Sequence, residues 1–140
     1  MQVCTDGAAR GNPGPAGAGA VLQSADGRVL GRVGRYLGHQ TNNVAEYEAI
    51  LLGLRAAQEL GATEVRLVSD SELLIKQIKG VYRVKAAHLK PYHADVMRLA
   101  RTFAAFEAVH VKREQNKAAD QMANRAVDEE LDGTLERTGL

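Results

Sequence analysis

Hydrophobic and polar positions alternate along the chain with two periods, one typical of strands and the other typical of helices. Short runs of β-branched and small apolar residues predict strands over residues 2–6, 18–24, 28–37, 65–68 and 108–112. Apolar residues three and four positions apart predict helices over residues 43–60, 73–79, 94–105 and 117–131. The order β-β-β-α-β-α-α-β-α is typical of an α/β domain in which helices cover a mixed sheet.

Turn and cap signals between these segments indicate how the strands pair. The dipeptide Asp26-Gly27 supplies the positive φ of a tight hairpin, so the first three strands are expected to be antiparallel. Thr41 or Asn42 is placed to cap the helix that follows. After the strand over residues 65–68 the chain passes directly into a helix, an order that favours parallel pairing.

Composition narrows the class of protein. Of the 140 residues 45% are hydrophobic and 25% charged, and no repeat divides them, so we expect one domain over residues 1–140. No apolar run approaches the roughly 20 residues of a membrane span and the start does not resemble a secretory signal, which predicts a soluble, cytoplasmic protein without membrane contact. Cys4 is the only cysteine, which excludes an intrachain disulfide and argues against a thiolate zinc site. No obvious oligomer interface is present, and a monomer is expected.

The distribution of charge says more than its total. With 18 basic and 17 acidic residues, the chain is not a polycation that holds nucleic acid by bulk electrostatics. Residues 73–94 contain basic residues and no acidic one, and this stretch either meets phosphate or is solvated surface. The acidic tail over residues 128–140 is either disordered or packed on the edge of the sheet.

Four carboxylates stand at element ends or in helices among small and apolar residues, namely Asp6, Glu46, Asp70 and Asp120. Asp6 and Asp70 end strands that are expected to be parallel neighbours, so both emerge at the sheet edge where α/β folds place ligands. Carboxylates crowded in a partly buried site repel one another unless a cation neutralises them. All-oxygen donors suit Mg²⁺ or Mn²⁺, which favours phosphodiester hydrolysis. Taken singly, each acid is as readily a cap or an ion-pair partner, so this prediction rests on the four together.

Four motifs in this order carry a resemblance to a known family. They are Thr5-Asp-Gly-Ala-Ala-Arg-Gly-Asn-Pro-Gly-Pro-Ala-Gly17, Thr41-Asn-Asn-Val-Ala-Glu-Tyr-Glu-Ala49, Ser69-Asp-Ser71 and Asn116-Lys-Ala-Ala-Asp120. From residue 1 to about 127 the chain resembles type 1 ribonuclease H, which cleaves the RNA strand of RNA/DNA hybrids. The resemblance implies a ribonuclease H-like fold with a five-stranded mixed sheet flanked by helices.

The resemblance also implies a metal-dependent mechanism. Asp6 and Asp70 would bind or bridge two Mg²⁺ ions, with Mn²⁺ as an alternative, while Glu46 completes one ion site and Asp120 the other. Water would attack in line at phosphorus, leaving a 5′-phosphate and a 3′-hydroxyl without a protein nucleophile.

Recognition of the hybrid needs groups that sense the 2′-hydroxyl of the RNA strand, and short amides suit that task. Glycine backbones approach the hybrid closely because they carry no Cβ, and Thr41 and Arg10 would contact phosphate. Without the family pattern, helix caps and a turn would explain most of these positions. The residues expected to contact the hybrid are Gly7, Arg10, Gly11, Asn12, Thr41, Asn42, Asn43, Ser71, Tyr82, Lys85, Arg113 and Asn116.

The chain departs from the family pattern at two points. Some members hold the hybrid with a long loop rich in lysine and tryptophan, but this chain has no tryptophan and residues 80–91 match the shorter form. Tyr82 and Lys85 there make either a smaller phosphate contact or a plain surface connection. Many members carry a mobile histidine before the last helix, and here Arg113 is expected to replace it electrostatically. His110 precedes that segment and is structural unless it faces the metals.

Three alternatives compete with this interpretation. A nuclease of the same fold could act on another duplex, against which Asn12, Asn42 and Asn43 argue. A hybrid-binding module with a decayed metal site is disfavoured because all four acids are present. A structural domain of a larger polymerase is disfavoured because the chain starts at Met1 and the pattern of elements is complete.

Overall fold

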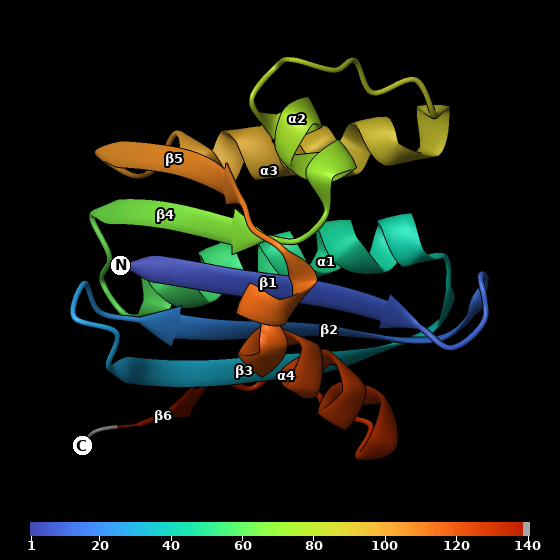
Figure 1. Ribbon diagram of the computed structural model, residues 1–140, viewed down its shortest axis with the longest axis horizontal. Helices are drawn as coiled ribbons and strands as arrows, with labels where there is room; N and C mark the ends of the chain where they lie inside the picture. Colours follow the sequence, from blue (N-terminus) through green and yellow to red (C-terminus); the bar gives the residue numbers. More distant parts are fainter. Residues whose placement is uncertain (139–140) are drawn as a thin grey trace.

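The computed structural model describes residues 1–138 and arranges them as one mixed sheet with helices on both faces (Figure 1). The strands are β1 (Gln2–Ala9), β2 (Gly14–Gln23), β3 (Val29–Gln40), β4 (Glu64–Ser69), β5 (Ala105–His110) and β6 (Glu136–Arg137). The helices are α1 (Asn42–Glu59), α2 (Glu72–Ile78), α3 (Lys90–Ala100) and α4 (Lys117–Asp128), with short 3₁₀ turns η1 (Ala87–Leu89) and η2 (Arg113–Gln115).

The strands lie in the order β5-β4-β1-β2-β3-β6. β1, β2 and β3 are antiparallel neighbours, whereas β4 is parallel to β1 and β5 is parallel to β4. The turn between β2 and β3 contains Gly27 at φ +86°, the positive angle that the sequence predicts. β1 pairs with β2 along its whole length, but its pairing with β4 ends at Cys4 and Val68. The two strands therefore part just before Asp6, which leaves room for a site.

The sheet has six strands, so the expectation of five is wrong. β6 adds to the far edge of β3, where Gly31 pairs with Arg137. Arg125 on α4 holds the strand there, because its guanidinium donates to both carboxylate oxygens of Glu136 at 2.9 and 3.0 Å. The acidic tail is therefore packed on the sheet edge as far as residue 138. Residues 139–140 of that tail lie outside the described residues.

Several element boundaries also differ from the sequence prediction: β1 and β3 extend further, β2 begins earlier, α4 ends at Asp128, and α3 and β5 are displaced. The helix expected over residues 94–105 is α3, which begins at Lys90 and ends at Ala100. Pro91 lies in its first turn, where the missing N–H of proline has no helical partner to lose. The strand expected over residues 108–112 is β5, which runs from Ala105 to His110. It begins earlier than expected because α3 already ends at Ala100.

Helices cover both faces of the sheet, with α4 in front of it and α1 behind it in Figure 1. Gly53 of α1 lies against Val3 and Ala20, whereas α4 lies against Gly19, the residue before Ala20 on β2. Because successive residues of a strand face opposite sides, the two helices pack on opposite faces. The main core lies on the α1 side, and α3 packs against the outside of α1.

Within residues 1–138, none of the helices has the length and hydropathy that a membrane crossing requires.

Candidate active site

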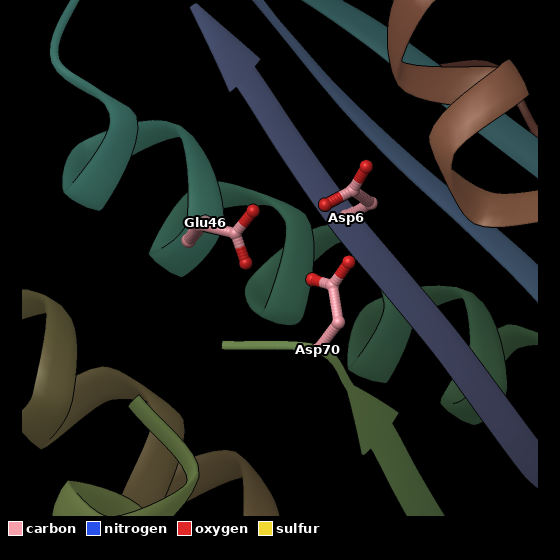
Figure 2. A group of neighbouring side chains, drawn as sticks. All are labelled: Asp6, Glu46 and Asp70. Atoms are coloured by element: carbon pink, nitrogen blue, oxygen red, sulfur yellow. The ribbon is translucent and has the colours of Figure 1, made fainter. Parts of the chain in front are cut away.

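Three carboxylates meet where β1, β4 and α1 come together, as Figure 2 shows. Asp6 lies on β1, Asp70 directly follows β4, and Glu46 lies on α1. One carboxylate oxygen from each residue lies within 4.8 Å of the other two. Asp6 is only 6% exposed, and the other two side chains are half-buried. The structure therefore brings together three of the four predicted acids in a group that is partly withdrawn from water.

The carboxylate of Glu46 is tied to both neighbouring strands. The backbone N–H of Gly7 donates to Glu46 Oε1 at 2.9 Å. The side chain of Ser69, the last residue of β4, favours the charged form of Glu46 and so opposes the rise in its pKa, and Ser69 Oγ accepts from the N–H of Ser71 at 3.0 Å. Ser69 has no exposed surface and is a residue of the site that the sequence analysis did not name among the candidate site residues. Its place beside Asp70 at the end of an apolar strand was the signal that could have found it.

Glycine is required at position 7 because α1 rests directly on β1 there. A Cβ on Gly7 would lie 2.2 Å from the carbonyl carbon of Ala45 and 2.3 Å from the amide nitrogen of Glu46. This contact sets Glu46 beside Asp6. The space that glycine leaves open is thus filled by α1, which differs from the expectation that it serves close approach of the hybrid.

Burial and mutual repulsion favour the protonated forms of the three carboxylates. Burial, followed by the negative charge of Glu46, raises the pKa of Asp6 to about 10. Burial likewise raises the pKa of Glu46 to about 7, although the N–H of Gly7 favours its charged form. Burial also raises the pKa of Asp70. At neutral pH three free charges are therefore disfavoured, and a hard divalent cation is the natural replacement for the retained protons.

Asp120 reaches the same pocket from the first turn of α4. The pocket has a volume of about 480 Å³ and is lined by Asp6, Gly7, Ala8, Ala9, Asn42, Glu46, Asp70, Arg113 and Asp120. The side chain of Asp120 lies near enough to Asp6 to add to the rise in the pKa of Asp6. Asp120 is not part of the group whose oxygens lie within 4.8 Å of one another. It borders the three-carboxylate group without joining it.

Of the predicted amides, Asn42 lines this pocket, and Asn12 is hydrogen-bonded to it. The backbone N–H of Asn42 donates to Asn12 Oδ1 at 3.0 Å, and the N–H of Ala9 donates to Asn42 Oδ1 at 3.1 Å. Both amide oxygens are thus engaged inside the protein, and both side chains are exposed. Their NH₂ groups are left as donors toward solvent. Asn43, in the first turn of α1, is exposed and does not line the pocket.

Several other predicted contacts have structural partners. Arg10 forms an ion pair with Asp128 at 2.7 Å. Thr41 caps α1 by accepting from the N–H of Val44, and Ser71 caps α2 by accepting from the N–H of Leu74. Gly11 has a φ of +92°, which explains glycine in this turn.

Tyr82 and Lys85 lie on the connection between α2 and α3 and are absent from the lining of the carboxylate pocket. Both are exposed, and the hydroxyl of Tyr82 accepts from Lys76 Nζ at 3.2 Å. Asn116 is only 2% exposed, which separates it from the other predicted substrate contacts. A direct contact between its amide and a hybrid does not fit this burial.

Two basic residues lie near Asp70. Arg113 is exposed, lines the pocket, and its positive charge opposes the rise in the pKa of Asp70. His110 ends β5 beside Ser69, and in its protonated form it acts on Asp70 in the same direction. Arg113 thus lies at the pocket, in the segment where the sequence analysis expects it to replace a histidine.

A larger pocket, of about 550 Å³, lies at the other end of the strands near Met1, Ser24 and Phe106. Its charged residues include Arg66 and Glu107, which are paired with each other at 3.2 Å. It has none of the clustered carboxylates, so chemistry rather than volume identifies the candidate active site.

Comparisons with known proteins agree with this geometry. A model of the reverse transcriptase-like family matches residues 4–126. The crystal structure of RNase H1 from Halobacterium salinarum superimposes with a TM-score of 0.89 at 38% identity, covering 91% of this chain and 97% of that one. LC11-RNase H1, solved in complex with an RNA/DNA hybrid, gives a TM-score of 0.87 at 41% identity, covering 91% of this chain and 96% of that one. The fold is therefore a ribonuclease H-like α/β fold.

Curated sequences give the family. A ribonuclease H of Pseudomonas syringae is 32% identical over an alignment 146 positions long, which covers 92% of this chain and 93% of that protein. The chain belongs to the type 1 ribonuclease H family. It spans 34% of the length of the bifunctional protein Rv2228c of Mycobacterium tuberculosis, which is 43% identical over 124 residues covering 88% of this chain. It also spans 62% of ribonuclease HI of Halobacterium salinarum, which is 40% identical over 124 residues covering 89% of this chain.

Proposed function

We propose that this chain is an endoribonuclease that hydrolyses the RNA strand of RNA/DNA hybrids and leaves 5′-phosphate and 3′-hydroxyl ends. The observation that carries the proposal is the group formed by Asp6, Glu46 and Asp70, whose oxygens lie within 4.8 Å of one another in a ribonuclease H-like fold. The hybrid in the complex of LC11-RNase H1 supports the choice of substrate class. We also propose that the chain acts as a monomer of one domain.

The donor set fits Mg²⁺ or Mn²⁺, because it consists of carboxylate oxygens from three separate elements whose protons a cation would displace. Asp6 and Asp70 would bind or bridge two ions, with Glu46 completing the site of one and Asp120 that of the other. Such ions, when bound, activate water and stabilise the leaving oxygen of a phosphodiester.

The protein's own contribution is to hold these charges and to admit the phosphate. Cys4 is buried, so a thiol nucleophile is not available at the pocket, and the four carboxylates act as ligands. Arg113 places a positive charge at the pocket beside Asp70, where it would attract a phosphate and take the electrostatic role of the histidine found in many members.

Substrate choice would come from the side-chain amides of Asn12 and Asn42. The NH₂ groups of Asn12 and Asn42 are suited to donate to the 2′-oxygen or to base edges in the shallow minor groove of a hybrid. Gly11 would offer a backbone contact to the hybrid, and Asn43 a side-chain contact. Phosphate contacts by the remaining predicted residues are part of the proposal, and they are Arg10, Thr41, Ser71, Tyr82 and Lys85.

An end-labelled cleavage assay tests the proposal. The protein is incubated with an RNA/DNA hybrid, an RNA duplex, a DNA duplex or single-stranded RNA, in Mg²⁺, Mn²⁺ or a chelator. We expect loss of the hybrid's RNA strand alone and only with a metal. Cleavage of another duplex instead would contradict the substrate, and binding of the hybrid without cleavage in either metal would contradict the activity.

A further inference from the structure

Asn116 links two parts of the chain that are distant in sequence. It occupies the N-cap position of α4, yet its side chain makes no capping hydrogen bond. Instead Asn116 Nδ2 donates to the carbonyl oxygen of Thr5 at 2.9 Å, across 111 positions of the chain. Asparagine at an N-cap position usually caps its own helix. Here the side chain of Asn116 instead links the start of α4 to β1.

This hydrogen bond fixes the orientation of the amide. The carbonyl of Thr5 only accepts, so the NH₂ group must face it. Asn116 Oδ1 is then buried and accepts no hydrogen bond from residues 1–138. A buried acceptor without a donor is unfavourable, so stability of the helix start alone does not explain an asparagine here. The Nδ2–Thr5 bond is what the residue provides.

The bond joins the immediate neighbours of two acidic residues. Thr5 precedes Asp6 on β1, and the N–H of Asp120 donates to the backbone oxygen of Asn116 at 3.2 Å, one helical turn into α4. The route from Asp6 to Asp120 thus passes only through Thr5, the amide of Asn116 and one turn of helix.

The backbone in the middle of α4 packs directly against two glycines of β2. A Cβ on Gly19 would lie 2.3 Å from the amide nitrogen of Ala123, and one on Gly17 would lie 2.4 Å from the carbonyl oxygen of Ala123. A helix backbone resting on two glycines has no side chain on β2 that interlocks with it at this point. The ion pairs of Arg10 with Asp128 and of Arg125 with Glu136 hold the C-terminal half of α4, whereas the amide of Asn116 holds the start of the helix, where Asp120 lies.

We propose that Asn116 is a positioning residue whose hydrogen bond to Thr5 sets the distance between Asp120 and Asp6, and so the part of the cation site that Asp120 supplies. Asn116 acts through α4 and contacts neither the hybrid nor the cation. This inference rests on the function proposed above.

The first test measures Mn²⁺ binding to the protein alone by isothermal titration calorimetry, together with kcat and KM on a hybrid. We expect Asn116→Ala to weaken Mn²⁺ binding and to lower kcat, each by about 10-fold to 100-fold, with KM changed less than about twofold. Asn116→Ser, which keeps a donor and is a milder change, is expected to fall between Asn116→Ala and the wild type. Val33→Ala, a core truncation on β3, is the control for lost stability and should keep the wild-type Mn²⁺ affinity.

The second test is a double-mutant cycle with Asp120→Asn. If Asn116 acts only through Asp120, adding Asn116→Ala to Asp120→Asn changes Mn²⁺ affinity by less than about twofold further. An undiminished effect in that background would overturn the proposal, as would a raised KM with unchanged kcat, which indicates a substrate contact. A wild-type protein that binds Mn²⁺ but cuts no hybrid would contradict the proposed function instead, and the calorimetric cycle would still decide the role of Asn116.

Discussion

Asp6 is a residue whose chemistry is set by its surroundings. Its side chain is almost fully buried beside Glu46 and Asp70, which raises its pKa to about 10. The sequence alone predicted that these acids gather, because Asp6 and Asp70 follow apolar strand segments. It did not predict Ser69 or the burial of Asn116, since the partners of both are set by packing between segments that lie far apart in the chain.

The raised pKa of Asp6 predicts a pH dependence of stability in chelator. The folded protein retains a proton that the unfolded chain releases, so stability falls as the pH rises from about 4 toward 10. Asp6→Asn removes this penalty. Urea unfolding should therefore show the variant more stable than the wild type at pH 8, by at least about 1 kcal/mol, with the gap closing toward pH 4. A gap that is independent of pH would contradict the raised pKa.

At the scale of elements, periodicity predicted some segments better than others. α1 begins and ends within one residue of its predicted bounds because small and apolar residues recur throughout its 18 residues and Thr41 caps its start. α3 begins at Lys90, earlier than predicted, because Pro91 lies in its first turn, where proline is readily accommodated. β6 was not predicted at all, since two residues carry no pattern and an ion pair with Arg125 holds them.

The seating of α1 on β1 gives a prediction at this scale. Gly7→Ala would place a methyl group against the backbone of α1, so we expect a loss of about 1–3 kcal/mol in the free energy of unfolding. Mn²⁺ binding should weaken as well, because α1 carries Glu46. Gly27→Ala is the control, since no atom lies within 4 Å of its Cβ and only its positive φ is strained. Equal Mn²⁺ affinity in both variants would show that the Gly7 contact does not place Glu46.

At the scale of the whole molecule, the sheet assembles the site from distant segments. The parting of β1 and β4 after Cys4 and Val68 opens a space, and the two strands and α1 each place one carboxylate there. α4 adds Asp120 from the other face of the sheet, and Arg113 stands at the pocket. With a net charge of only +1, attraction of a polyanion must be local. The roles of Tyr82 and Lys85 in it stay predictions.

The most direct test of the carboxylate site is single-turnover cleavage of an end-labelled hybrid by the wild type and Asp70→Asn, in Mg²⁺ and in Mn²⁺. Asp95→Asn is the matched control, because Asp95 is a carboxylate on α3 that pairs with Arg98 and does not line the pocket. The site described here predicts that Asp70→Asn folds normally but cleaves about 100-fold more slowly or worse, several kcal/mol in the barrier, while Asp95→Asn cleaves like the wild type. Cleavage by Asp70→Asn within a few-fold of the wild-type rate would contradict it.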